Sequence, residues 1–263
     1  MLSRGRDVDP IMRKLFYSSI LLTKLEHPRH LTITQREQVV KDGLGDREGS
    51  VRIAAGKVVD AWFDGIVSEG SGTIIGDILG FLQIFDVVGP GDVAADALQW
   101  LFTTRKDVLD EIVFDGSCSN AVSVIAKVLT TTTESFWIEL TPESALLARV
   151  FVDHCLGTND EIRLHAASLP VVTAFAFHIR DAYNVFLELT EENKIFEAAA
   201  KENLDKEEEI AEATFVLCEL LKVAVRLDYT NEIGRRRISA VVRKLLSLFS
   251  CTWCSRYINN VRT

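Results

Sequence analysis

The fold of this chain is decided by residues 44–62, which read Leu-Gly-Asp-Arg-Glu-Gly-Ser-Val-Arg-Ile-Ala-Ala-Gly-Lys-Val-Val-Asp-Ala-Trp. A turn that contains Asp46 precedes a helical pattern in which Ala54 and Ala55 share one face with larger apolar residues. Small residues let a neighbouring helix approach closely, so this face is typical of the inner helix of a hairpin in a stack of hairpins. We expect Asp46 and Arg52 to form structural hydrogen bonds between successive hairpins. The stretch predicts a solenoid, and solenoids of this kind bind partners and rarely catalyse.

Helical periodicity dominates the rest of the chain, and the alternating pattern of β-strands is absent. Thr34 and Glu37 fit a capping box, in which the threonine accepts a hydrogen bond from a helical amide and the glutamate returns one. Asp92 is expected to cap a second helix, and Thr141 opens a third because Pro142 fits the first helical turn. The sequence therefore predicts an all-α chain of antiparallel helical pairs.

Two further patterns refine this prediction. A helix that starts after Asp160 should be kinked or broken at Pro170, because proline lacks the amide hydrogen. Between Ile210 and Leu227, apolar residues recur at helical spacing and predict one amphipathic helix. We expect the following small residues at helix contacts: Ala54, Ala55, Ala94, Ala97, Ala166 and Ala167.

The composition indicates a helical protein without membrane partners. The chain has 263 residues, of which 48% are hydrophobic and only 5 are proline. The longest run without Asp, Glu, Lys or Arg covers residues 164–179, whereas a membrane span needs about 20 apolar residues. Residues 1–7 lack the apolar segment of a secretory signal, and the odd number of cysteines, 5, fits a reducing compartment. We expect the protein in the cytosol or the nucleus.

Charge is distributed unevenly along the chain. Residues 1–64 hold 11 basic and 9 acidic side chains, residues 65–232 hold 11 and 29, and residues 233–263 hold 7 and none. A solenoid can place basic residues on one face and acidic residues on another, so the net charge of −9 does not exclude nucleic acid. The acidic middle segment is a poor candidate for binding phosphate.

Several separated blocks of sequence resemble one protein family and so make the fold prediction more specific. The first block reads Lys-Leu-Glu-His-Pro-Arg-His-Leu-Thr at residues 24–32 and continues through residues 35–39 and 41–47. The later blocks are residues 93–98, 140–145, 148–152, 169–174 and 228–236. Together they resemble the G-type HEAT-repeat subunit of condensin, and the resemblance covers most of residues 15–246. It implies an α-solenoid of HEAT-type repeats over the whole chain, 1–263.

The resemblance implies a non-catalytic function. In condensin the coiled-coil SMC ATPase subunits hydrolyse ATP, and the G-type subunit binds the kleisin subunit, through which it joins them. With the kleisin it forms a basic groove that holds double-stranded DNA during mitotic chromosome condensation. The implied location is the nucleus and the chromosome, and also the cytoplasm. No cofactor is implied.

The chain also departs from the family pattern. Members of the family are several times longer, with repeats on both sides of this region. Residues 116–134 stand where the family has a shorter connection, and we expect deletion of 116–133 to leave thermal stability nearly unchanged. Residues 247–263 read as a divergent tail. Glu48 and Gly49 stand where the family tends to have Asp-Pro, so the helix that follows should begin less sharply.

Six basic residues are the candidate contacts to DNA phosphates. Lys24, Arg29, Arg36 and Lys41 are expected at exposed helix ends and turns, where side chains reach the rim of a groove. Plain solvated surface is an equally good interpretation of these four. The other two, Arg235 and Arg236, belong to the basic cluster at residues 235–244, which has no acidic neighbour after Glu232 and equally suits a solvated helix start.

Other site signals are weak. Cys251 and Cys254 form a lone pair without the further ligands of a zinc site. His27 and His30 flank a proline in a turn, where histidines touch phosphate less often than they cap or pack, and no further metal ligands accompany them. Residues 89–92 lack the Gly-Lys-Ser/Thr of a phosphate loop. The sequence therefore predicts no enzyme, no metal site and no cofactor.

A solenoid adaptor of the importin or adaptin type is the main alternative. Such a protein binds peptides and not DNA, and the acidic segment 65–232 suits a basic peptide. Only the sequence blocks that resemble the condensin subunit argue against this alternative. Binding to duplex DNA separates the two functions.

Overall fold

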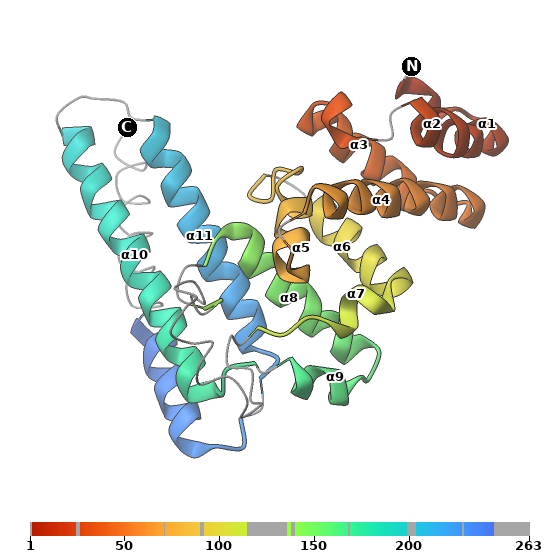
Figure 1. The fold of residues 1–263 in the computed structure, drawn as a ribbon. Helices are drawn as coiled ribbons and strands as arrows, with labels where there is room; N and C mark the ends of the chain where they lie inside the picture. The colour runs from red at the N-terminus through yellow and green to blue at the C-terminus, as the bar shows by residue number, and fades with distance from the viewer. Residues whose placement is uncertain are drawn as a thin grey trace. The chain divides into compact units, whose positions relative to one another are not determined.

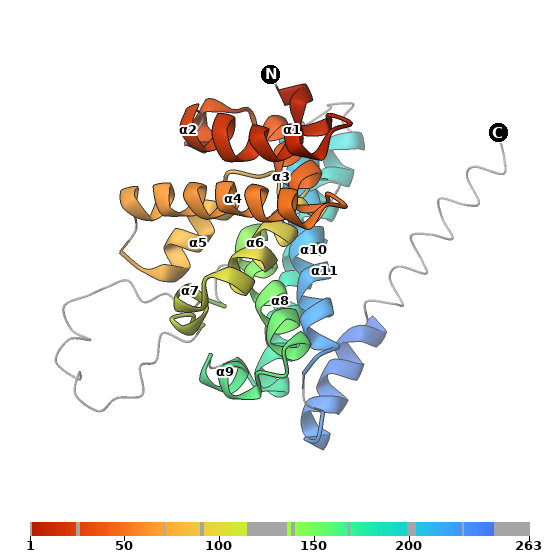
Figure 2. The ribbon, with the colours of Figure 1, turned by 90° about the vertical axis from the view of Figure 1, so that its right-hand side faces the viewer.

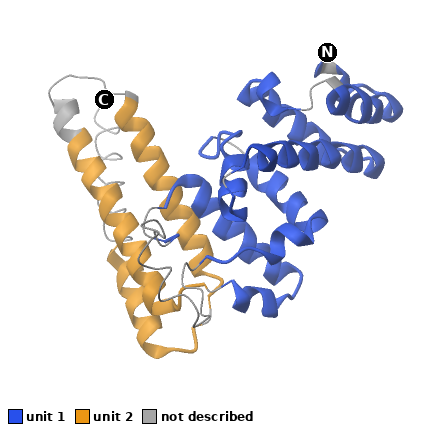
Figure 3. Ribbon diagram, in the orientation of Figure 1, with its two compact units in different colours: residues 1–168 blue, residues 169–263 orange. Residues whose placement is uncertain are grey.

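The computed structural model describes residues 2–24, 27–70, 72–89, 92–114, 136–137, 140–167, 169–198, 204–227 and 229–244. Within these ranges the regular structure is helical and contains no strand, which confirms the predicted all-α fold (Figure 1). The predicted insertion at 116–134, the tail at 247–263 and the pair Cys251 and Cys254 lie outside the described residues. Contacts divide the chain into two compact units, residues 1–168 and 169–263 (Figure 3). The single segment 1–263 stays a prediction.

Unit 1 is built from short helices that follow one another along the chain. In order they are η1 (Leu2–Arg6), α1 (Pro10–Leu15), η2 (Phe16–Leu21), α2 (Leu22–Lys24), η3 (Pro28–His30), α3 (Ile33–Leu44), α4 (Gly49–Glu69), α5 (Ile74–Leu82), α6 (Val93–Thr104), α7 (Lys106–Asp110), α8 (Pro142–Gly157) and α9 (Glu161–Ala166). Helices α1, α4, α6 and α8 lie one after another along the unit, and each contacts the next (Figure 2). This succession is the arrangement expected of stacked helical repeats.

Helix α4 confirms the pattern that residues 44–62 predict. Ala54, Ala55 and Trp62 are buried on the face that packs against neighbouring helices. Gly43 of α3 lies so close to Ala55 that a Cβ atom there would stand 2.4 Å from the alanine Cβ. Small side chains on both helices are therefore what lets α3 and α4 pack at this distance.

The core of unit 1 is aromatic. Phe63 and Phe81 meet edge to face with ring centroids 5.7 Å apart, and Phe102 meets Phe151 in the same way at 6.2 Å. Phe114, after α7, also packs edge to face on Phe151, at 5.1 Å. These five rings are at most 1% exposed. The first pair joins α4 to α5, and the other three rings join α6, α8 and the segment after α7.

Unit 2 consists of a long helical hairpin and a further helix. Helix α10 (Val172–Ala198) packs against α11 (Leu204–Ala224), and residues 232–244 form the last described helix. Apolar residues hold the two helices of the hairpin together. Near its tip, Lys206 of α11 also joins it to α10, because its Nζ lies 2.9 Å from an oxygen of Glu192. The predicted stripe after Ile210 is confirmed in its second half, where Leu217, Leu220 and Ala224 are buried.

Several helix boundaries agree with the sequence. Thr141 caps α8, with Pro142 in the first turn, and Asp160 accepts a hydrogen bond from the amide of Arg163 at the start of α9. Helix α9 ends at Ala166, so the chain is already out of helix before Pro170. Glu48 precedes α4 without a capping side-chain hydrogen bond, as expected for a helix that begins less sharply.

Three local predictions were wrong. Thr34 does not cap α3; Thr32 does, because its hydroxyl accepts from the amide of Gln35 while the Gln35 side chain accepts from the amide of Thr32. Asp92 precedes α6 but its side chain forms no capping hydrogen bond. Ala166 is exposed because it ends a six-residue helix, whereas the next residue, Ala167, is buried.

Candidate nucleic-acid interface

The first candidate cation, Arg29, lies on the one-turn helix η3. His27 shapes this turn, because its Nδ1 accepts a hydrogen bond from the Arg29 amide at 3.2 Å. The Arg29 guanidinium reaches the end of α4, where Nη2 lies 2.7 Å from Oε2 of Glu69. The arginine side chain is 75% exposed, so this ion pair is solvated and contributes little to stability. An anionic ligand can therefore compete for Arg29 at low cost.

Arg36 is not the exposed side chain that the sequence predicted. It lies in the first turns of α3 and is half-buried, with Nε donating to the carbonyl of Leu31 at 3.2 Å and Nη1 donating to the carbonyl of Ile84 at 2.6 Å. Burial lowers the pKa of Arg36 from its ordinary value. Arg36 thus connects α3 to the turn after α5, and its guanidinium is already hydrogen-bonded.

Of the two candidate lysines in residues 1–64, the structure describes the side chain of only one. Lys41 is exposed in the last turn of α3, and none of the described residues forms an ion pair with it. Lys24 ends α2, and its side chain lies outside the described part of the chain. Of the four candidates in this segment, Arg29 and Lys41 are the ones that the structure places at the surface.

Arg235 and Arg236 lie near the start of the last described helix of unit 2, residues 232–244. Arg235 donates to the carbonyl of Tyr229 at 2.7 Å, and Arg236 forms an ion pair with Glu232 at 2.5 Å. Both are exposed. Arg237 differs from them, because its guanidinium lies 5.0 Å from the ring centroid of Phe177 on α10. The basic cluster therefore presents Arg235 and Arg236 as exposed cations, whereas Arg237 lies over the aromatic ring.

The two structural candidates, Asp46 and Arg52, have different partners. The Asp46 carboxylate accepts from Arg13 of α1, at 2.6 Å from Nε and 3.0 Å from Nη2. Arg52 donates to the main-chain carbonyls of Asp46 and Arg47, at 2.7 and 3.0 Å. Asp46 thus links the α3–α4 loop to α1, whereas Arg52 orders its own loop.

Sequence reasoning missed Arg13. The signal was present, because Arg13 occurs three and four residues before Phe16 and Tyr17 and so shares their buried helix face. A lone arginine on such a face needs an acidic partner. The hydrogen bond from Arg13 lowers the pKa of Asp46, which keeps the carboxylate ionised.

Other kinds of site find no support within the described ranges. No group of three or more His, Cys, Asp or Glu side chains there is arranged to hold a metal ion. No helix in the described part of the chain combines the length and the apolar character that a membrane crossing requires. Cys155 is buried, and burial raises the pKa of its thiol to about 11.

Comparison with known proteins identifies the relatives of the chain. No family model matches it. The condensin complex subunit 3 proteins of Schizosaccharomyces pombe, Saccharomyces cerevisiae and Homo sapiens are 29%, 27% and 27% identical to it, each over 94% of this chain. The alignments cover 23%, 21% and 22% of these relatives, so the chain spans less than a quarter of their length.

The fold agrees with a solved structure of the same kind. The crystal structure of the S. pombe condensin Cnd3-Cnd2 subcomplex contains a chain that matches with a TM-score of 0.71 and 29% identity. The match covers 94% of this chain and 28% of the solved one. Along 94% of its length, the chain is therefore related in sequence and in fold to condensin complex subunit 3.

Proposed function

We propose that this chain belongs to a condensin subunit that performs no catalysis itself and binds double-stranded DNA and a kleisin during mitotic chromosome condensation. The observation that carries the proposal is the similarity over 94% of the chain, in sequence to condensin complex subunit 3 and in fold to one chain of the solved Cnd3-Cnd2 subcomplex. In this function the kleisin connects the chain to the SMC ATPase subunits. The protein then acts on chromosomes in the nucleus, and it also occurs in the cytoplasm.

The physical properties of the chain support DNA as the ligand. A helical solenoid offers an extended surface, and duplex DNA is bound without sequence preference when lysines and arginines neutralise its phosphates. Arg29, Lys41, Arg235 and Arg236 are exposed, and the acidic partners of Arg29 and Arg236 are themselves about half-exposed or more. Solvated ion pairs are weak, so phosphates can replace Glu69 and Glu232 as partners.

The test compares two alanine variants of the whole chain on duplex DNA. One variant replaces Lys24, Arg29 and Lys41, and the other replaces Arg235 and Arg236. Arg36 is left intact because it binds two carbonyls of the fold. Affinity is measured by fluorescence anisotropy at several salt concentrations, with random and fixed sequences and with and without a kleisin peptide.

Each variant should weaken binding to random and fixed duplexes alike, because phosphate contacts carry no base information. The slope of log affinity against log salt should become shallower by about 0.9 for each phosphate that the variant no longer neutralises. The control replaces Lys106, an exposed residue of α7 outside the candidate set, and should change neither quantity. Unchanged affinity and slope in both test variants contradict the proposed DNA contacts.

A further inference from the structure

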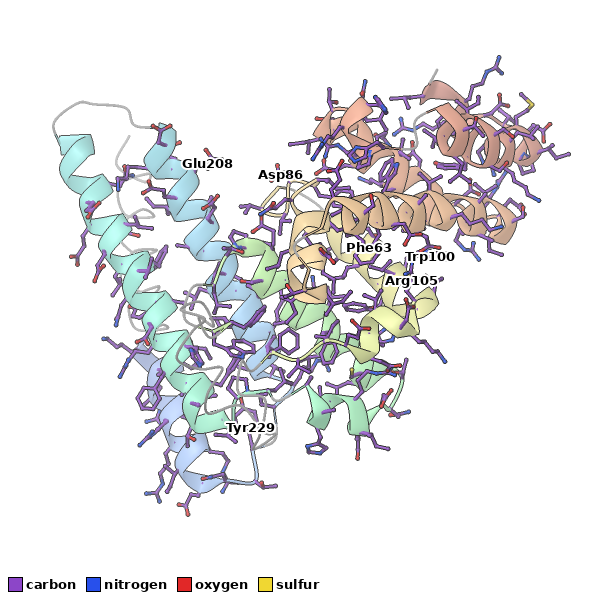
Figure 4. The ribbon with its side chains drawn as sticks, in the orientation of Figure 1. Phe63, Asp86, Trp100, Arg105, Glu208 and Tyr229 are labelled. Atoms are coloured by element: carbon purple, nitrogen blue, oxygen red, sulfur yellow. The ribbon has the colours of Figure 1, made fainter. Side chains whose placement is uncertain are left out.

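Trp100 of α6 lies directly against the backbone of α4 (Figure 4). A Cβ atom added at Gly56 would stand 1.9 Å from Cε2 and Cζ2 of the indole ring, which is closer than any real contact. Only glycine at this position lets the ring approach the helix so closely. Trp100 is only partly exposed, whereas Trp62 of α4 is fully buried. A large aromatic ring is thus held rigidly at a surface shared by two helices.

Two aspartates flank this ring. Asp96 precedes Trp100 by one helical turn on α6, and Asp60 follows Gly56 by one turn on α4. Thr104, one turn after Trp100, fixes the second aspartate, because its hydroxyl donates to Oδ1 of Asp60 at 3.2 Å. The helix geometry therefore places one carboxylate on either side of the indole along α6.

Neighbouring cations do not fully neutralise these carboxylates. Arg105 is engaged with Asp64, at 2.7 Å, and with Asp107, at 3.0 Å. Burial raises the pKa of Asp60, with a smaller contribution from Asp64, and the influence of Arg105 does not reverse this. The single positive charge of Arg105 is thus divided among three carboxylates, those of Asp60, Asp64 and Asp107.

The same imbalance exists at the other end of the ring. Burial, and then the charge of Asp92, raise the pKa of Asp96, against the opposing influence of Arg149. Arg149 lies 3.9 Å from Asp92 and 3.7 Å from Asp153, so its charge is also divided. A cation bound beside Asp96 would favour the charged form of its carboxyl.

The indole nitrogen is unusual as well. Nε1 of Trp100 is close enough to Asp60 to lower the pKa of that carboxyl, yet it is enclosed and has no acceptor in hydrogen-bonding geometry among the described residues. Nearby on α4, Lys57 is exposed without an ion pair in the described structure, and Ile53 is 56% exposed. The surface combines an aromatic ring, an apolar side chain and two under-neutralised carboxylates.

We propose that Asp60, Trp100 and Asp96 bind the arginine or lysine side chain of a basic peptide segment from a partner protein. The cation would lie on the exposed part of the indole, where aromatic rings attract cations, and each carboxylate would lie within reach of its N–H groups. Arginine fits better than lysine, because its planar guanidinium stacks on a ring while donating to carboxylates at its edge. The excess of carboxylates disfavours phosphate ligands at this surface. The function is separate from the DNA contacts proposed above.

The test uses three fluorescein-labelled peptides that alternate glycine with arginine, with lysine or with glutamate. The chain should bind the arginine peptide best, the lysine peptide more weakly and the glutamate peptide not at all. Trp100→Leu should weaken binding of the arginine peptide by about tenfold, whereas Trp100→Phe keeps most of it. Asp60→Asn combined with Asp96→Asn should weaken it by about tenfold and reduce its salt dependence.

The matched control combines Asp181→Asn with Glu188→Gln, which together remove the same two negative charges from the exposed surface of unit 2. It should bind the arginine peptide like the original chain. Circular dichroism reports whether each variant folds; if Trp100→Leu does not, the double aspartate variant decides. Equal binding of the double aspartate variant and the control, or no binding by the original chain, overturns the proposal. These variants leave the proposed DNA contacts unchanged, so their affinity for duplex DNA should not fall. A failure of the peptide proposal can therefore be distinguished from a failure of the DNA proposal.

Discussion

Arg13 of α1 and Asp46 of the α3–α4 loop form an ion pair in which both side chains are less than 10% exposed, with Nε 2.6 Å from Oδ2. Arg13 also donates to the main-chain carbonyls of Asp7 and Val8. One arginine thus ties the first helix to the start of the repeat that the sequence identified.

Replacing Asp46 by asparagine should destabilise the chain, because it leaves the covered guanidinium of Arg13 without a counter-charge. Urea denaturation followed by circular dichroism measures the effect. The matched control is Asp42→Asn, whose partner Arg6 is 63% exposed and easily solvated. The midpoint should fall clearly for Asp46→Asn and little for Asp42→Asn. Equal shifts would show that coverage of the pair has no energetic consequence.

The stability that Asp46 contributes should disappear in acid. Its pKa in the folded chain lies below the ordinary value of 3.8, mainly because Arg13 donates hydrogen bonds to the carboxylate. A lowered folded pKa means that the contribution is complete above pH 3.8 and is lost as the pH falls through the folded pKa. Urea midpoints of the original chain and Asp46→Asn should therefore converge below that pH. A constant difference down to pH 2 contradicts this assignment.

The pH dependence of stability that comes from Asp60 should be opposite in sign to that from Asp46. Burial raises its folded pKa above 3.8, so the native state binds a proton more readily than the unfolded state does. Stability is then lost as the pH rises through the window between the two pKa values, and Asp60→Asn should be more stable than the original chain at pH 7. The Oδ1 atom of asparagine can still accept from Thr104. Thermal unfolding at pH 7 and pH 3 tests this, since the advantage should vanish at the lower pH.

Gly56→Ala should destabilise unit 1 by about 1 to 3 kcal/mol, because the new methyl group collides with the Trp100 ring and forces it to move. Gly80→Ala is the matched control. A Cβ atom there would meet Ile66 at an ordinary 3.5 Å, so the better helix propensity of alanine should stabilise the chain by up to about 1 kcal/mol. Denaturant titration measures both changes. Opposite signs are expected, and a stabilising Gly56→Ala contradicts the close approach.

Arg36→Ala should lower the free energy of unfolding by about 1 to 2 kcal/mol, because it removes two charged hydrogen bonds to carbonyls. Lys41→Ala, an exposed change on the same helix, should alter it by less than about 0.5 kcal/mol. Chemical denaturation distinguishes the two residues independently of DNA binding. Equal and small effects would restore Arg36 as a candidate phosphate contact.

Much of the fold followed from sequence because helices are encoded locally. The small and large apolar residues at 51–62 repeat at helical spacing, so the inner face of α4 could be identified without coordinates. Thr141 with Pro142, and Asp160, mark helix starts through hydrogen bonds to amides only a few residues away. The cap of α3 was misplaced because Thr32 and Thr34 offer equivalent local signals, and only the positions of the amides distinguish them.

The sequence by itself determined the all-helical class, the condensin resemblance and the acidic and basic segments, because these depend on order and spacing along the chain. Only the tertiary structure decided which charged side chains are free to act. Arg36 meets the carbonyl of Ile84, 48 residues away, Arg13 meets Asp46, 33 residues away, and Trp100 meets Gly56. Such contacts depend on how helices pack, and the local spacing of residues does not specify which distant groups the packing brings together.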